Sequence, residues 1–177
     1  MDLSKVHCLS VSYNGVSNQI QCSIQVSFPK SLLTEGEVAL ENTCLAIWDT
    51  GATGSAITAL TARKLNLAPT GVKRVSGLGG TIQKNVYLVD VVLPNNVRIP
   101  DLSVTEIDNP QDDKGNPIDN FGVLIGMDII SRGDFSITNF EGKTLMSFRM
   151  PSIVKTDYVD EWKRRMAVQQ KYKGGRK

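Results

Sequence analysis

Histidine is almost absent from this chain: His7 is the only one among 177 residues. Serine and cysteine hydrolases usually need a histidine base beside the nucleophile. Cys8 is adjacent to His7, and adjacent residues of a strand point to opposite faces, so the two are not expected to pair. The three cysteines, Cys8, Cys22 and Cys44, lack C-x-x-C spacing. With one histidine they do not supply the ligands of a zinc site, and we expect no metal.

Long apolar runs are also lacking. No stretch is long enough to span a bilayer, and the first 15 residues lack the apolar segment of an export signal. We therefore expect no membrane partner, a cytoplasmic location and reduced thiols. There is no phosphate-binding loop, and "GLGG" at 77–80 lacks the third glycine and the following helix of a dinucleotide fingerprint, so no cofactor is expected. The net charge of +2 indicates no particular partner.

Apolar residues make up 41% of the chain and aromatic residues only 6%, so aliphatic side chains must build the core. Most segments read as short strands separated by turn residues, and one helical pattern runs over 58–66, with Thr58 as its cap and Asn66 as its stop. This pattern predicts an all-β domain over residues 1–150, folded as a small closed or half-closed barrel. The predicted strands cover residues 6–13, 19–28, 43–48, 81–93 and 97–107, with a last hairpin over 135–150.

Residues 151–177 form a basic tail. Residues 152–177 hold 8 Lys/Arg and 3 Asp/Glu, whereas the rest of the chain holds 12 basic and 15 acidic residues. Apolar residues at helical spacing within 153–168 predict an amphipathic helix. A nucleic-acid role would depend on this tail alone. Because basic surface faces are usually just solvated, nucleic acid is not the expected partner.

An Asp-Thr-Gly tripeptide ends an apolar strand in the stretch "IWDTGATGSAIT", residues 47–58. Taken alone, the tripeptide is consistent with a turn in which Asp49 accepts backbone N–H groups. The segments on either side are apolar, however, which places the carboxylate beside a buried surface where its protonation can be tuned. Asp49 is therefore the candidate catalytic residue.

Two further motifs follow in order. "SGLGG" at 76–80 lies between two strand-like segments and predicts a glycine-rich hairpin tip. A flexible turn would explain the glycines, but an apolar Leu78 at the tip favours a segment that folds over a ligand or a second subunit. "VLIGMDII" at 123–130 on its own indicates only a buried junction between a strand and a helix.

Together, the three motifs resemble those of the retropepsin-type aspartic proteases, the single-lobed family that includes the retroviral proteases and bacterial relatives. The resemblance covers residues 6–150 and implies hydrolysis of peptide bonds. It implies that Asp49 is the catalytic aspartate, that the Thr50 hydroxyl grips the partner chain's loop, and that the Gly51 backbone approaches substrate. It also implies that Gly126 lets its strand pack under this loop, with Asp128 in a structural position. The implied flap and substrate contacts are Ala52, Ser76, Gly77, Leu78, Gly79, Gly80 and Ile125.

The chemistry of this family needs two carboxylates around one water, one accepting its proton and the other polarising the scissile carbonyl. The chain contains one Asp-Thr-Gly and is far too short for two lobes. We therefore expect a two-fold homodimer that acts on a polypeptide, with Asp49 of each chain on the axis. Ala52 cannot donate the hydrogen bond that a serine there would offer, so we expect activity at mildly acidic to neutral pH.

Some features depart from the retroviral pattern. The chain has 48 residues before Asp49, an acidic loop at 108–120, and a tail beyond Met150. The loop could restrict the cleft or favour basic substrates, and the tail helix could pack across a dimer or bind a partner. The alternative to catalysis is a silent, dimeric peptide-binding module that kept the fold, because a fold alone does not settle function.

Overall fold

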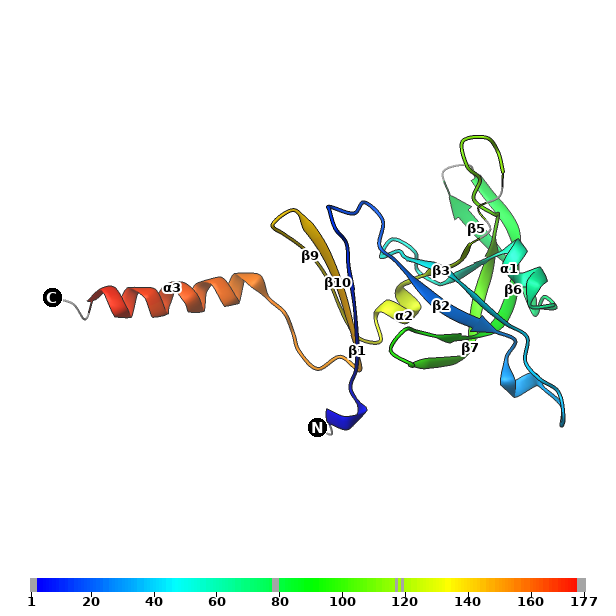
Figure 1. The fold of residues 1–177 in the computed structure, drawn as a ribbon, viewed down its shortest axis with the longest axis horizontal. Coiled ribbons are helices and arrows are strands. Elements are labelled where there is room, and N and C mark those ends of the chain that lie inside the picture. Colours follow the sequence, from blue (N-terminus) through cyan, green and yellow to red (C-terminus); the bar gives the residue numbers. More distant parts are fainter. Residues whose placement is uncertain (1–2, 78–79, 117, 119, 175–177) are drawn as a thin grey trace.

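The computed structural model describes residues 3–77, 80–116, 118 and 120–174. A β-barrel occupies one end, a small second sheet lies beside it, and a helix projects from the other end (Figure 1). The strands are β1 (His7–Ser12), β2 (Gln21–Ser27), β3 (Glu41–Trp48), β4 (Ala56–Thr58), β5 (Gly71–Gly77), β6 (Gly80–Val92), β7 (Arg98–Ile107), β8 (Phe121–Ile125), β9 (Asp134–Phe140) and β10 (Lys143–Met150). The helices are α1 (Ala59–Lys64), α2 (Met127–Ile130) and α3 (Tyr158–Gly174), with single 3₁₀ turns at Leu3–Lys5 and Lys30–Leu32.

The barrel closes because β2, at one edge of the larger sheet, also pairs with β6 near the other edge. The larger sheet runs β2-β3-β8-β4-β7-β6-β5, and β2 also pairs with β6, which joins six strands into a ring. Strand β5 remains outside this ring as the second arm of a hairpin with β6. The all-β class and the closed barrel predicted from the sequence are confirmed.

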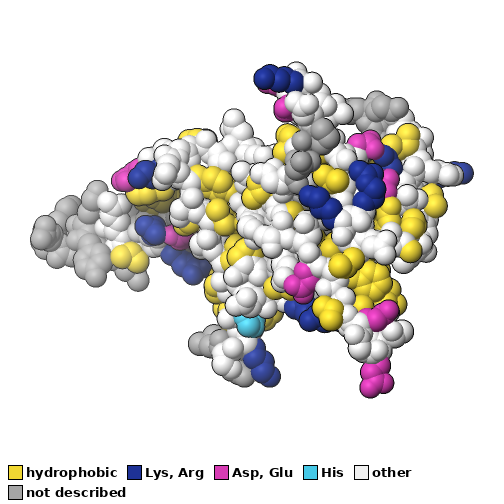
Figure 2. Space-filling view, turned by 45° about the vertical axis from the view of Figure 1, so that its right-hand side comes forward, with side chains coloured by type: hydrophobic (Ala, Val, Ile, Leu, Met, Phe, Trp, Pro, Cys, Tyr) yellow, Lys and Arg dark blue, Asp and Glu magenta, His cyan; other side chains and the backbone are white. Residues whose placement is uncertain are grey.

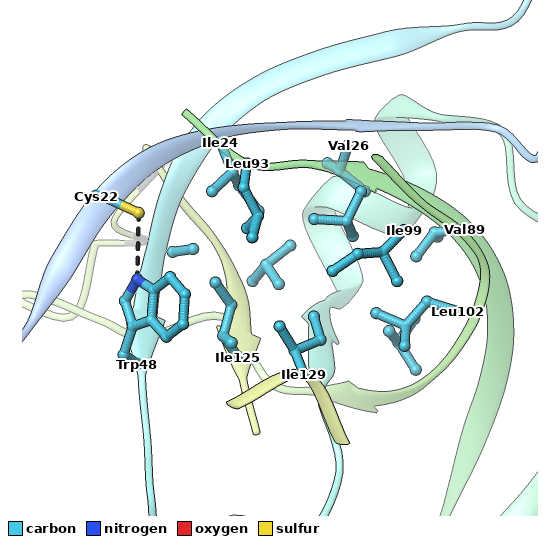
Figure 3. Close-up of a cluster of buried hydrophobic side chains, with 14 of the residues drawn as sticks. Cys22, Ile24, Val26, Trp48, Val89, Leu93, Ile99, Leu102, Ile125 and Ile129 are labelled. Carbon is cyan, nitrogen blue, oxygen red and sulfur yellow. Dashed lines mark hydrogen bonds between the residues drawn. The ribbon is translucent and has the colours of Figure 1, made fainter. Parts of the chain in front are cut away.

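The barrel is filled by aliphatic side chains, as the low aromatic content predicts. Alternate residues of each strand point inward, so that Ile24, Val26, Val89, Ile99 and Ile125 pack together at 2% exposure or less (Figure 3). Burial of such side chains is the main favourable term in folding, at about 1.5–3 kcal/mol for each one. The packed interior gives the strand ends that carry the candidate site a rigid base.

The second sheet joins strands from both ends of the domain. It runs β1-β10-β9 and is antiparallel throughout, with Leu9 opposite Phe148 on its inner face. Trp48 connects this sheet to the barrel: its ring stacks on Phe135 at 5.5 Å and contacts Phe148 at 5.0 Å, between ring centroids. The Trp48 indole N–H also donates a 3.2 Å hydrogen bond to the Cys22 sulfur (Figure 3). The residue directly before Asp49 is thus held on two sides.

Local signals in the sequence account for several element ends. The Thr58 hydroxyl accepts a hydrogen bond from the Thr61 N–H and caps α1, and Asn66 adopts a positive φ of 51° just after the helix. Glu141 and Gly142, at φ values of 52° and 74°, form the tight turn between β9 and β10. The sequence pattern anticipated each of these boundaries.

The tail differs from the prediction in its bounds and surroundings. Its helix, α3, spans Tyr158–Gly174 rather than beginning near residue 153, and its side chains are exposed as far as Gln170. Tyr158, Val159 and Trp162 are each more than 60% exposed, so no part of the chain that the structure describes covers the expected apolar face. Among the helices that the structure describes, none is long and apolar enough to cross a membrane.

Candidate active site

The loop that carries Asp49 begins where β3 ends. Strand β3 runs parallel to β8 with Trp48 beside Ile125, and the Asp49 N–H donates a 2.9 Å hydrogen bond to the Ile125 carbonyl. The Asp49 carboxylate is half-exposed, and its Oδ1 accepts a 2.8 Å hydrogen bond from the Gly51 N–H. The loop thus presents one carboxylate at the barrel surface, and Thr50 and Gly51 beside it are exposed.

Glycines at 51 and 126 keep the loop close to its surroundings. A Cβ at Gly51 would lie 3.2 Å from the Asp49 Oδ1 and crowd the carboxylate. A Cβ at Gly126 would lie 2.5 Å from the carbonyl carbon of Gly54, closer than real Cβ contacts. Strand β8 can therefore approach the loop only with a glycine at 126, the role that the family resemblance implies for it.

A serine and an aspartate hold the far end of the loop. The Ser55 hydroxyl donates a 2.7 Å hydrogen bond to Asp128 Oδ1, and the Ser55 N–H donates one of 2.9 Å to Asp128 Oδ2. The Gly126 N–H donates to the Ser55 hydroxyl at 3.0 Å, and the Met127 N–H to the Ala52 carbonyl at 2.8 Å. Both ends of the 49–55 segment are thereby fixed to the junction of β8 and α2.

The predicted flap is the hairpin of β5 and β6. These strands pair from Gly71 opposite Val86 to Gly77 opposite Gly80, and Gly80 adopts a φ of 107° that favours glycine. The predicted tip residues Leu78 and Gly79 lie outside the described residues. Ser76 and Gly77 lie in the last two positions of β5.

A cavity of about 580 Å³ lies between the hairpin and the Asp49 loop. Gly51 and Ala52 border it from the loop, and Val75 and Ile82 border it from the hairpin. Its other lining residues are Thr53, Gly54, Ala56, Lys73, Arg74, Lys84, Thr105, Glu106, Ile107, Asp108 and Leu124. The cavity therefore joins the first sequence motif to the hairpin strands on either side of the second.

One predicted substrate contact lies elsewhere. Ile125 is completely buried in the barrel core, and its neighbour Leu124 lines the cavity instead. Successive residues of a strand point to opposite faces, so only one of the two can reach the cavity. The third motif thus contributes to the site through Leu124, Gly126 and Asp128.

Charged side chains of both signs border the cavity. The Lys84 Nζ lies 2.6 Å from Asp108 Oδ1. Glu106 Oε2 accepts hydrogen bonds from the Tyr87 hydroxyl at 2.5 Å and the Asn85 amide at 3.2 Å. Burial, and then the hydrogen bond to Glu106, raise the pKa of Tyr87, which stays a neutral donor. Within the described ranges, no three His, Cys, Asp or Glu side chains lie close enough to share a metal ion.

Sequence reasoning missed Ser55 and Lys73, and read Asp128 only as structural in the family. Ser55 and Asp128 are 73 residues apart and meet only because β3, β4 and β8 are neighbours in the barrel. The alternation of "VKRV" could have placed Lys73 and Val75 on one face of a strand. Which face lines a cavity depends on the folded barrel.

A family model and several solved structures are similar to this chain. Residues 34–129 match the family model described as "Aspartyl protease". Among solved structures, EIAV protease complexed with the inhibitor HBY-793 is 16% identical, with a TM-score of 0.45 over 68% of this chain and 92% of that one. A retropepsin-like aspartic protease from Rickettsia conorii is 13% identical, with a TM-score of 0.44 over 82% of this chain and 96% of that one.

No curated protein sequence matches the chain. The family model nevertheless spans more than half of the 177 residues and includes the Asp49 loop, the β5–β6 hairpin and the β8–α2 junction. The family predicted from the sequence motifs is confirmed by this match. The chain belongs to the aspartyl protease family.

Proposed function

We propose that this protein is an aspartic endopeptidase, with water activated between two Asp49 carboxylates, one from each subunit of a homodimer. One observation carries the proposal: the Asp49 loop and the β5–β6 hairpin border the same cavity. Gly51 and Ala52, which follow the half-exposed Asp49 in its loop, border a space of about 580 Å³, large enough for side chains of a substrate. Family membership supports the same chemistry.

The need for a second carboxylate supports the homodimer. One carboxylate takes a proton from water while the other, protonated, polarises the carbonyl, and two such groups held close together share one proton. The chain offers a single Asp-Thr-Gly. Thr50 and Gly51 are exposed beside Asp49, where a second loop could meet them across a two-fold axis. In this arrangement the Thr50 hydroxyl contacts the partner's loop, and the Gly51 backbone faces the substrate.

An extended polypeptide is the substrate that suits this cavity. Strand-like peptides bind beside a hairpin by backbone hydrogen bonds, and alternate side chains enter pockets on one side. Ala52, Val75, Ile82 and Leu124 supply an apolar lining, and Ile82 is 52% exposed. The flap proposed for residues 76–80 closes over the peptide and excludes water from the cleaved bond.

The test compares wild type with Asp49→Asn on a peptide library between pH 4 and 8, with products identified by mass spectrometry. Asparagine keeps the shape but cannot accept the proton, so we expect the cleavage rate to fall by about a thousandfold or more. Asp113→Asn is the matched control, because Asp113 is exposed in the 108–120 loop. Cleavage that persists in Asp49→Asn would contradict the proposed mechanism. Tight binding without cleavage by wild type would indicate a peptide-binding module.

A further inference from the structure

We infer that the cavity beneath the hairpin selects an acidic side chain, Asp or Glu, of the substrate, with Lys73 as the selecting residue. This inference rests on the proposed function and names its substrate class. Lys73 is exposed and borders the same cavity as Gly51 and Ala52 of the Asp49 loop. Lys73 would determine which substrates bind, whereas the hydrolysis itself does not depend on Lys73.

The register of the hairpin places two lysines together. Lys73 pairs with Lys84, and Val75 pairs with Ile82 two positions nearer the tip. Directly opposite residues and those two positions away share one face, so these four side chains lie on the cavity side of the hairpin. Like charges directly opposite each other on a sheet are destabilising. Asp108 already offsets the charge of Lys84, so an anion beside Lys73 would remove the repulsion that remains.

The carboxylates around the cavity already have partners. Asp108 forms the ion pair with Lys84, and Glu106 accepts hydrogen bonds from Tyr87 and Asn85. Lys73 and Arg74, which both border the cavity, form no ion pair with any side chain that the structure describes. Three cationic and two anionic side chains line this space, and the net charge of +1 favours an anionic guest. Figure 2 shows basic and acidic side chains close together over the barrel end of the molecule.

This arrangement does not support selection of basic substrates by the 108–120 loop. Of that loop, Asp108 alone borders the cavity among the described residues, and Lys84 neutralises it. Asp112 instead accepts hydrogen bonds from the Lys114 and Asn116 N–H groups within its own turn. The excess charge that a peptide meets in the cavity is positive.

The position of Lys73 sets where the acidic residue should lie. Lys73 is four residues from Gly77 at the end of β5, about 13 Å along an extended strand. If the end of the hairpin lies over the cleaved bond, as proposed for the flap, a peptide bound along the hairpin would place the acidic residue about two to four positions from that bond. In a two-fold dimer this preference should appear on both sides of that bond.

The experiment uses peptides with an apolar pair at the centre and Glu, Gln or Lys at each of these positions. Cleavage by wild type gives kcat/KM, and fluorescence anisotropy with Asp49→Asn gives binding without cleavage. We expect Glu to be preferred over Gln by about fivefold, the size of one partly exposed ion pair, and the preference to shrink in about 0.5 M salt. Lys73→Glu should reverse it in favour of Lys peptides. Lys143→Glu, an equal charge change at the start of β10, should leave it unchanged.

The outcomes separate this inference from the proposed function. Cleavage with the same Glu-to-Gln ratio in wild type and Lys73→Glu overturns the inference and leaves the peptidase intact. Preferential binding of Glu peptides by Asp49→Asn, with no cleavage by wild type, supports the inference and overturns the peptidase. If Asp49→Asn binds none of the peptides, or wild type prefers Lys peptides, the inference is wrong.

Discussion

Ser55 illustrates how much of the candidate site depends on a residue outside the Asp-Thr-Gly motif. Its hydroxyl donates to Asp128 and accepts from the Gly126 N–H, so that a single side chain fixes the loop end to the β8–α2 junction. Ser55 is only 2% exposed. If its hydroxyl is removed, its buried hydrogen-bond partners are left unsatisfied, which is costly. Its role is to position the loop that carries Asp49.

Ser55→Ala should lower both stability and turnover. The Gly126 N–H and the Asp128 carboxylate each lose a partner, which should cost about 1–3 kcal/mol in the free energy of unfolding. A loosened loop misplaces Asp49 for the reaction more than for peptide binding, so kcat should fall more than KM rises. Urea denaturation and steady-state kinetics measure the two effects. Ser136→Ala on the exposed part of β9 is the control, and an equal change in both variants would count against a positioning role.

Asp134, the first residue of β9, connects this strand to the segment that follows β10. Its carboxylate lies 2.5 Å from Arg149 Nη2 and accepts hydrogen bonds from the Ile153 N–H at 3.0 Å and the Ser152 hydroxyl. These bonds, with the Ile153 N–H the largest contributor, hold the pKa of Asp134 well below its usual value. The segment that leads from β10 toward α3 is thereby attached to the small sheet.

Acid should weaken this attachment. Because the folded pKa lies below the unfolded one, Asp134 stabilises the fold above about pH 4, and this contribution is lost as the pH falls below that value. Asp134→Asn should therefore be less stable than wild type at pH 7, and the difference should shrink between about pH 4 and 2. Denaturation curves across this range measure it. Asp113→Asn, at an exposed position, is the charge-matched control, and a constant gap between wild type and Asp134→Asn would contradict the assignment.

The sequence predicted the positions of the strands better than it predicted which strands pair with one another. Alternation identified β2, β3, β6 and β7 to within a few residues, because each has one face in the core. The three residues of β4 are too few to show a period, and all three are buried. The separation of β1, β9 and β10 into their own sheet depends on pairing between strands more than 130 residues apart, as between Ser10 and Ser147. Local pattern carries no information on that partner.

For the molecule as a whole, the terminal strands bear on how two copies could meet. β1 pairs along its length with β10 of the same chain, from His7 opposite Met150 to Ser12 opposite Leu145. The backbone hydrogen bonds of these strands are thus used within one chain on the sides that face each other. A dimer with both Asp49 loops on its axis would bring together the exposed loop surfaces around Thr50.

Activity should then depend on protein concentration. Dissociation separates the two carboxylates, so specific activity should fall on dilution with a midpoint at the dimer dissociation constant. Sedimentation velocity over the same concentrations should show the shift from dimer to monomer. A protein that remains monomeric at high concentration and still cleaves peptides would contradict the shared site.

The single Asp-Thr-Gly loop in each chain has a genetic consequence. If two copies share one site, an Asp49→Asn subunit inactivates each wild-type subunit that it joins. In a cell that makes both in equal amounts, about one quarter of the dimers would carry two intact loops. An inactivating allele would therefore be dominant. The loss of activity in cells that make both subunits would measure how freely the subunits exchange.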